Sequence, residues 1–209
     1  MGTASQVQFF WWRVLHDWTH LRRPRYLSRK AAEFGIQKQG RHYKARVLGK
    51  EMLFTAPHLS NTINEVDSWE RDYLPTDVKG KVVLSVGDGC GETSLFYLAH
   101  GAAKVIAIEK EQEAFELLCK NVRENNLNVE AMNDAFKLAH LDIAHDFMKI
   151  DIEGGEKILL ESRSRELTPC VIEAHRYDDD RLPEKLQKRF GMRQLSKNGR
   201  NAVLLTNVR

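Results

Sequence analysis

The chain has 209 residues, of which 42% are hydrophobic and 29% are charged, and this is typical of a globular protein with one sizeable core. No apolar run approaches the ~20 residues that a membrane-spanning helix needs, and we find no signal-peptide pattern, so we expect a cytoplasmic protein, with membrane-peripheral attachment as the alternative. Three cysteines, far apart and without a C-x-x-C pair, argue against a disulfide framework or a zinc knuckle.

Positive charge is concentrated near the N-terminus. Residues 1–50 hold eleven basic and two acidic residues, a net charge of +9, whereas residues 51–209 have a net charge of −6. Residues 7–21 predict an amphipathic helix, rich in aromatic residues, with an apolar stripe formed by Val7, Trp11, Val14, Trp18 and Leu21. Three partners remain open for residues 7–30: the protein's own domain or a second copy in a homodimer, an anionic membrane surface, and nucleic acid.

Short strands and a helix follow this basic segment. His42 to Val47 and Glu51 to Thr55 favour a β-hairpin, because a glycine lies in the turn between two β-prone runs. A helix is predicted over Asn61 to Tyr73. We therefore expect an N-terminal extension of residues 1–60, made of the amphipathic helix and the short strands, ahead of a second domain of residues 61–209.

The most informative stretch begins with the apolar run Val82 to Val86, which predicts a buried strand before a glycine-rich turn and a helix. A dinucleotide loop reads G-x-G-x-x-G, but here the glycines occupy alternate positions. This tighter spacing resembles motif I of the class I S-adenosylmethionine-dependent methyltransferases; a glycine-rich turn without a cofactor is the alternative. The candidate cofactor-binding residues of this stretch are Ser85, Gly87, Asp88, Gly89 and Gly91.

Strands and helices then alternate as in a parallel α/β sheet. Lys104 to Ile108 predicts a second strand that ends at Glu109, where a carboxylate can accept hydrogen bonds from both hydroxyls of a ribose. A helix over Glu113 to Asn126 and a strand over Val129 to Met132 come next. Asp134, just beyond that strand, is a candidate contact of an adenine amino group, with a helix N-cap as the alternative.

Acidic residues follow the next two predicted strands. An apolar strand precedes Asp151 and Glu153, and Cys170 to His175 predicts the neighbouring strand. Because the carboxyl ends of parallel strands meet at one edge of a sheet, we expect these side chains to converge near the substrate. His175 is our first candidate for a catalytic base, and Asp151 or Glu153 is the second; Asp151 is also a candidate cofactor contact. The acids permit a divalent cation without requiring one, and we assign no metal ligand.

Residues 60–209 resemble the FkbM-type methyltransferases. The residues that carry the resemblance are Val86 to Ser94, Glu109, Asn121 to Leu127, Lys149 to Glu156, which is the most specific, and Val171 to His175. The resemblance implies an α/β, Rossmann-like class I sheet of seven strands with the last antiparallel, S-adenosylmethionine as the cofactor, and O-methylation of a hydroxyl. Ser85 departs from the family, because an acid normally stands at this position, and Asp88 is a candidate to compensate.

Together, these patterns favour an S-adenosylmethionine-dependent methyltransferase that acts on a hydroxyl of a glycan, a lipid or a small molecule. An RNA methyltransferase would use the basic N-terminal segment on phosphates, although no Asn-Pro-Pro-aromatic or Asp-Pro-Pro-aromatic tetrapeptide is present. A non-catalytic binding module is a further alternative if Ser85 marks a lost cofactor site. The glycine spacing and a closing hairpin over Met192 to Leu195 and Ala202 to Val208 disfavour an NAD-dependent oxidoreductase.

Overall fold

The computed structural model describes residues 30, 32–164, 166–198 and 201–208. The predicted amphipathic helix of residues 7–21, with its three alternative partners, lies outside the described residues. Within the described part of the chain, no helix is both long enough and apolar enough to cross a membrane.

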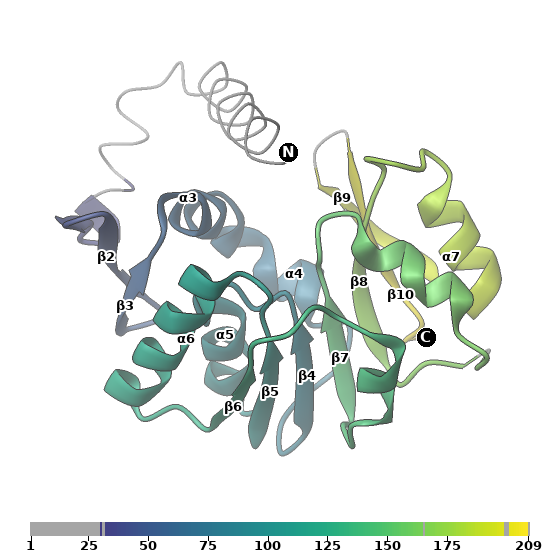
Figure 1. Ribbon diagram of the computed structural model, residues 1–209, viewed down its shortest axis with the longest axis horizontal. Helices are drawn as coiled ribbons and strands as arrows, with labels where there is room; N and C mark the ends of the chain where they lie inside the picture. Colours follow the sequence, from purple (N-terminus) through teal and green to yellow (C-terminus); the bar gives the residue numbers. More distant parts are fainter. Residues whose placement is uncertain (1–29, 31, 165, 199–200, 209) are drawn as a thin grey trace.

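A small antiparallel sheet precedes the main domain. It contains β1 (Gln37–Gln39), β2 (His42–Val47) and β3 (Lys50–Phe54), in that order (Figure 1). The predicted hairpin is confirmed, and its turn places Leu48 and Gly49 at φ values of +46° and +78°. The sequence did not predict β1, because its three residues are polar and exposed and give no alternating pattern.

The helical segment between the two sheets begins earlier than the sequence predicts. Helix α3 (Ala56–Glu65) has a proline in its first turn, and a 3-10 turn, η1 (Val66–Ser68), joins it to α4 (Trp69–Tyr73). Proline fits the first turn of a helix because no backbone donor is needed there. Helix α3 therefore runs across residue 60, where the sequence analysis set its domain boundary.

The main sheet has seven strands in the order β6-β5-β4-β7-β8-β10-β9. The strands are β4 (Val82–Val86), β5 (Lys104–Ile108), β6 (Val129–Met132), β7 (Phe147–Ile150), β8 (Cys170–His175), β9 (Arg193–Asn198) and β10 (Ala202–Thr206). Strand β10 is antiparallel to both of its neighbours, whereas the pairs from β6 to β8 are parallel. The predicted fold class is confirmed, including the closing antiparallel hairpin.

The other helices pack around this sheet (Figure 1). They are α5 (Glu92–Ala99), α6 (Gln112–Asn125), α7 (Leu182–Phe190) and the 3-10 segments η2 (Leu138–Asp142) and η3 (Gly155–Glu161). Alternate strand residues enter two apolar cores, as the two-residue period of a strand requires. Val83 and Phe147 face the core shared with α5 and the small sheet, whereas Leu84 and Met148 face the core shared with α7.

Asn121 of α6 joins the small sheet to the main domain. Its side chain is fully buried, and its Oδ1 accepts a hydrogen bond from the backbone N–H of Leu53 at 2.8 Å. Its Nδ2 donates to the carbonyl oxygens of Leu53 and Cys90, each at 2.8 Å. One amide therefore pairs three buried backbone groups of β3 and of the glycine-rich turn, groups that would otherwise be left without partners.

We expect Asn121→Leu to lower the free energy of unfolding by about 3 kcal/mol or more, because three buried backbone groups lose their partner. Urea unfolding measures the loss. Asn125→Ala is the matched control on the same helix: its amide donates to the carbonyl oxygens of Glu51 and Asn121 in a more exposed setting, and it should cost less than about 1 kcal/mol. Equal losses for the two variants would contradict the bridging role.

Candidate active site

A pocket of about 590 Å³ opens at the carboxyl ends of β4, β5 and β7, and α3 forms one of its walls. Six of the residues predicted from the sequence line it: Gly87, Gly89, Glu109, Asp134, Asp151 and Glu153. Ser85, Asp88, Gly91 and His175 are buried beside it and are not part of its lining. The site therefore lies at the edge where a parallel sheet normally binds its ligand.

The glycines of the turn have three different packing roles. A Cβ on Gly87 would lie 1.8 Å from the carbonyl oxygen of Asp151, so only glycine lets these two strand ends approach so closely. A Cβ on Gly89 would meet the tips of two pocket-lining side chains, Glu92 and His58, at 2.5 and 2.7 Å. Gly91 has a φ of +99° before α5 and packs on α6, where a Cβ would lie 2.9 Å from Leu118.

Glu109 lies at the tip of β5 with only 6% of its surface exposed. One carboxylate oxygen accepts the N–H of Gly89 at 2.9 Å, and the other accepts the N–H of Glu111 at 2.7 Å. These two bonds hold the carboxylate in one orientation at the pocket wall. Because an ionised carboxylate has about four acceptor positions, both oxygens can still accept a further hydrogen bond from a ligand.

Asp88 and Ser85 lie beneath the glycine-rich turn. The Asp88 carboxylate is 1% exposed and accepts a hydrogen bond from the Ser94 hydroxyl at 2.8 Å. Burial raises the pKa of Asp88 to about 7, against the effect of the hydrogen bond from Ser94. Among the described residues, the other Asp88 oxygen and the Ser85 hydroxyl have no hydrogen-bond partner. Neither side chain borders the pocket, so their direct contact with a cofactor remains a prediction.

Asp134 is at the pocket rim beyond β6. Its carboxylate pairs with the Lys137 ammonium at 2.6 Å, and the same hydrogen bond lowers the pKa of Asp134. The next two residues, Ala135 and Phe136, add an apolar surface to the pocket beside it. The helix-cap alternative does not hold for Asp134, because η2 begins at Leu138 and Lys137 is its N-cap.

His58 and Glu92 are two of the pocket residues that the sequence did not mark as site residues. His58 of α3 shares a 2.8 Å hydrogen bond between its Nδ1 and the Thr55 hydroxyl, and burial lowers its pKa. Glu92 begins α5 and accepts the N–H of Cys90 at 2.8 Å, while burial raises its pKa to about 8. Glu92 stands inside the glycine-rich motif and had a sequence signal, whereas His58 precedes the motif by about thirty residues and had none.

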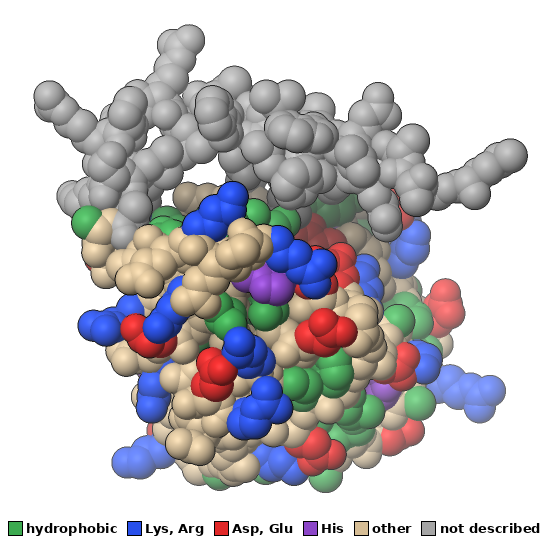
Figure 2. Space-filling view, turned by 60° about the vertical axis from the view of Figure 1, so that its left-hand side comes forward, with side chains coloured by type: hydrophobic (Ala, Val, Ile, Leu, Met, Phe, Trp, Pro, Cys, Tyr) green, Lys and Arg blue, Asp and Glu red, His purple; other side chains and the backbone are tan. Residues whose placement is uncertain are grey.

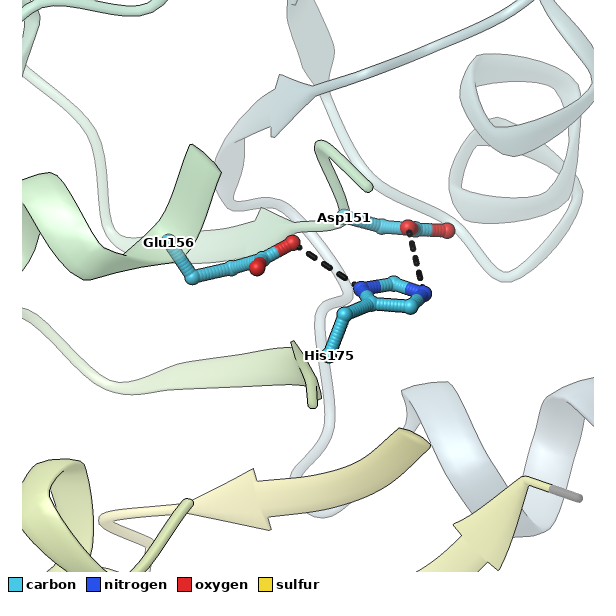
Figure 3. A group of neighbouring side chains, drawn as sticks. All are labelled: Asp151, Glu156 and His175. Carbon is cyan, nitrogen blue, oxygen red and sulfur yellow. Dashed lines mark hydrogen bonds and ion pairs between the residues drawn. The ribbon is translucent and has the colours of Figure 1, made fainter. Parts of the chain in front are cut away.

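Glu156 organises the turn that follows β7 and orients His175 (Figure 3). Its fully buried carboxylate accepts the N–H groups of Ile152 and Gly154, each at 3.0 Å, and lies 3.1 Å from Nδ1 of His175. The opposite nitrogen, Nε2, consequently faces three other carboxylates. Its distances to Asp151, Glu153 and Glu173 are 4.0, 3.5 and 3.8 Å, respectively.

These carboxylates determine the charge of His175. Burial alone would lower the pKa of the imidazole, but the hydrogen bond to Glu156 and the nearby carboxylates raise it to about 9. At neutral pH the imidazole is therefore a cation that balances the acids, whereas a general base has to begin without its proton. Asp151 and Glu153 border the pocket, and of the three predicted catalytic residues they are the two in contact with its space.

The same side of the pocket contains a second buried ion pair. Lys149 is 2% exposed, and its ammonium donates to Asp151 at 3.2 Å and lies 5.2 Å from the centre of the Tyr73 ring. Burial raises the pKa of Glu65 to about 7 and that of Glu173 to about 8. At this end of the pocket, two basic side chains, Lys149 and His175, therefore lie among a larger number of carboxyl groups.

The geometry also bears on metal binding. In the described part of the chain, Asp151, Glu156 and His175 each offer a ligand-type atom within 4.8 Å of the other two. Glu156 and His175 already bond to each other, and Glu156 accepts two backbone amides as well. Because these bonds give each of the buried atoms a partner, we assign no metal to the cluster.

Comparisons with known proteins identify the fold. No protein-family profile matches the chain. Two similar sequences come from viruses: protein 158B of Sulfolobus islandicus rod-shaped virus 1 is 29% identical over 127 residues, 59% of this chain and 78% of that protein. Protein 65 of Sulfolobus islandicus filamentous virus is 27% identical over 150 residues, 67% of this chain and 90% of that protein. Both are described as uncharacterized, so they assign no activity.

Three solved structures are similar over most of this chain. The T. thermophilus 16S rRNA N2 G1207 methyltransferase RsmC is 19% identical, with 88% of this chain and 61% of that one covered and a TM-score of 0.57. M. jannaschii TYW2 is 18% identical, with coverages of 81% and 85% and a TM-score of 0.58. A methyltransferase from Agrobacterium tumefaciens is 17% identical, with coverages of 81% and 70% and a TM-score of 0.57. The chain has the fold of class I S-adenosylmethionine-dependent methyltransferases.

The free energy of unfolding should fall as the pH rises from 6.5 through about 9, because folding raises the pKa of His175 from 6.5 to about 9. The stabilisation that the protonated His175 gives to the folded state is fully present below pH 6.5 and is lost above the folded pKa. It amounts to about 3 kcal/mol at most. Glu173, with its raised pKa, acts in the same direction.

Urea unfolding at a series of pH values measures this decline. Glu156→Gln removes the carboxylate that bonds to Nδ1 of His175 and should move the decline toward lower pH. A free energy that stays constant between neutral pH and about pH 10 would contradict the protonated state that we assign to His175.

Proposed function

We propose that this chain is an S-adenosylmethionine-dependent methyltransferase. The observation that carries the proposal is the Glu109 carboxylate, which two backbone amides hold at the pocket wall with acceptor positions to spare. Two neighbouring hydroxyls of a ribose match such a group. The crystal structures of RsmC and of M. jannaschii TYW2 are both complexes with S-adenosylmethionine, which supports the same cofactor for this fold.

The pocket residues fit the other parts of this cofactor. Phe136 and Ala135 offer an apolar surface for an adenine, next to the Asp134 carboxylate. The turn around Gly89 brings bare backbone to the pocket, close to the start of α5, where a helix N-terminus favours an anionic group such as a carboxylate. When bound, the cofactor supplies an electrophilic methyl group, and this chain's residues bind and orient the two reactants.

We infer that the acids after β7 receive the acceptor. Asp151 and Glu153 line the pocket on the side away from Asp134 and Phe136, and their carboxylates can accept a proton from an attacking group. His175 behind them orients and partly neutralises these carboxylates as a cation. The FkbM-type resemblance favours a hydroxyl acceptor on a glycan, a lipid or a small molecule.

An RNA methyltransferase is the second candidate. The net charge of +9 over residues 1–50 supports it, as does the likeness to RsmC, an rRNA methyltransferase. In the small sheet, part of this charge is paired: Arg41 with Glu113, and Lys44 with Glu51. Figure 2 shows Lys and Arg side chains interleaved with acids on this side of the molecule. Binding of RNA whose affinity falls steeply with salt would favour this candidate.

Calorimetric titration tests the cofactor assignment. The chain should bind S-adenosylmethionine and S-adenosylhomocysteine and not NAD. Glu109→Ala should weaken both affinities by more than about tenfold, because two ribose hydroxyls lose a charged acceptor.

Glu109→Gln is the companion variant, since it keeps the size of the side chain and removes its charge. Glu130→Ala is the control: Glu130 lies on β6 and pairs with Lys104 at the surface, and this change should leave both affinities unaltered. An unchanged affinity in both Glu109 variants would overturn the ribose role, and the absence of cofactor binding by the wild type would overturn the proposed function.

A further inference from the structure

One side of helix α3 is polar although it forms a wall of the pocket. His58, Asn61, Thr62 and Glu65 all line the cavity, and their spacing of three and four residues places them on one stripe of the helix. The apolar Leu59 is the buried anchor of the same helix. A row of polar side chains along a pocket wall differs from a solvated helix face, because part of the row is removed from water.

Thr62 has the most unusual environment in this row. It is 1% exposed, and its hydroxyl oxygen has no hydrogen-bond partner among the described residues. A threonine in a helix usually satisfies its hydroxyl with a carbonyl one turn earlier. The unpaired hydroxyl therefore costs the free protein stability, and such a cost calls for an explanation. Next to it, Asn61 also lines the pocket.

The wall facing α3 carries carboxylates. Asp151 and Glu153 line the pocket, and Glu65 adds a third carboxyl group from α3 itself. Two buried cations lie nearby: Lys149 already donates to Asp151, and Nε2 of His175 lies 3.5 Å from Glu153. Burial raises the pKa of Glu65 to about 7, and the neighbouring Asp151 and Glu153 carboxylates add to the shift. A ligand with its own negative charge would be repelled here, whereas N–H and O–H donors would find several acceptors.

The first and last residues of this polar row, His58 and Glu65, lie in different parts of the pocket. His58 lies against Gly89, on the side that the proposed function gives to the cofactor. Glu65 lies at the far end of α3, where the Asn198 amide contacts it at 3.4 Å and where Asp151 is close enough to raise its pKa. Asn61 and Thr62 are between these ends of the helix and line the same pocket.

We propose that Asn61, Thr62 and Glu65 of α3 form the acceptor-binding wall, and that the acceptor is a donor-rich group without negative charge. This inference rests on the proposed function, because the proposed cofactor position leaves the α3 side of the pocket for the acceptor. The acceptor supplies the partner that the Thr62 hydroxyl lacks in the free protein. A neutral polyol and an amine share the required chemistry, and the experiment distinguishes them.

Thr62→Val tests the wall, because it keeps the branched shape and removes only the hydroxyl. The melting temperature of the free protein should rise by roughly 2–4 °C, since an unpaired buried hydroxyl is lost. The affinity for S-adenosylmethionine should stay within about twofold of the wild type, whereas methyl transfer at low acceptor concentration should fall at least about fivefold. Ser60→Ala, on the exposed side of the same helix, should change none of the three.

Radiolabelled S-adenosylmethionine identifies the acceptor class. The probes are neutral polyols (methyl glucoside and adenosine), amines (glucosamine and spermidine) and anions (glucose 6-phosphate and 4-hydroxybenzoate). Label in the polyols or in the amines supports the proposal and decides between them. Label in the anions alone, or in no probe, overturns the acceptor class, and a lower melting temperature for Thr62→Val overturns the role of its hydroxyl. Loss of cofactor binding by the wild type would instead overturn the proposed function.

Discussion

The site depends on the close approach of two strand ends. A Cβ on Gly87 would lie 1.8 Å from the Asp151 carbonyl oxygen, so the first glycine of the turn lets β4 and β7 end against each other. The glycine-rich turn and the acids that follow β7 consequently border one pocket. Glu156 then fixes the backbone after Asp151 through two amide hydrogen bonds and orients His175 with the same carboxylate. A change at this contact would alter both walls together.

Charge is divided between two parts of the molecule. The pocket end after β7 is rich in carboxylates, and the buried cations Lys149 and His175 only partly neutralise them. The N-terminal fifty residues carry the opposite charge. The two charges therefore lie in different parts of the sequence, the carboxylates after β7 and the basic residues in the first fifty positions.

The sequence was sufficient to predict the main sheet and six of the residues that line the pocket. Strong apolar runs mark β4, β5, β7 and β8, and parallel strands bring Glu109, Asp151 and Glu153 to one edge. Other features depend on tertiary contacts. The position of Asp88 beneath the turn, the pairing of His175 with Glu156, and the placement of Thr62 at the pocket wall follow from packing, which no spacing rule reports.

Binding of S-adenosylmethionine between the glycine-rich turn and Glu109 is tested most directly by a crystal structure of the chain with S-adenosylhomocysteine. We expect the ribose hydroxyls within hydrogen-bond distance of the Glu109 carboxylate, and the sulfur on the side of the pocket that Asp151 and Glu153 line. A ligand bound elsewhere, or a pocket that remains empty at saturating ligand concentration, would contradict the assignment of this pocket as the cofactor site.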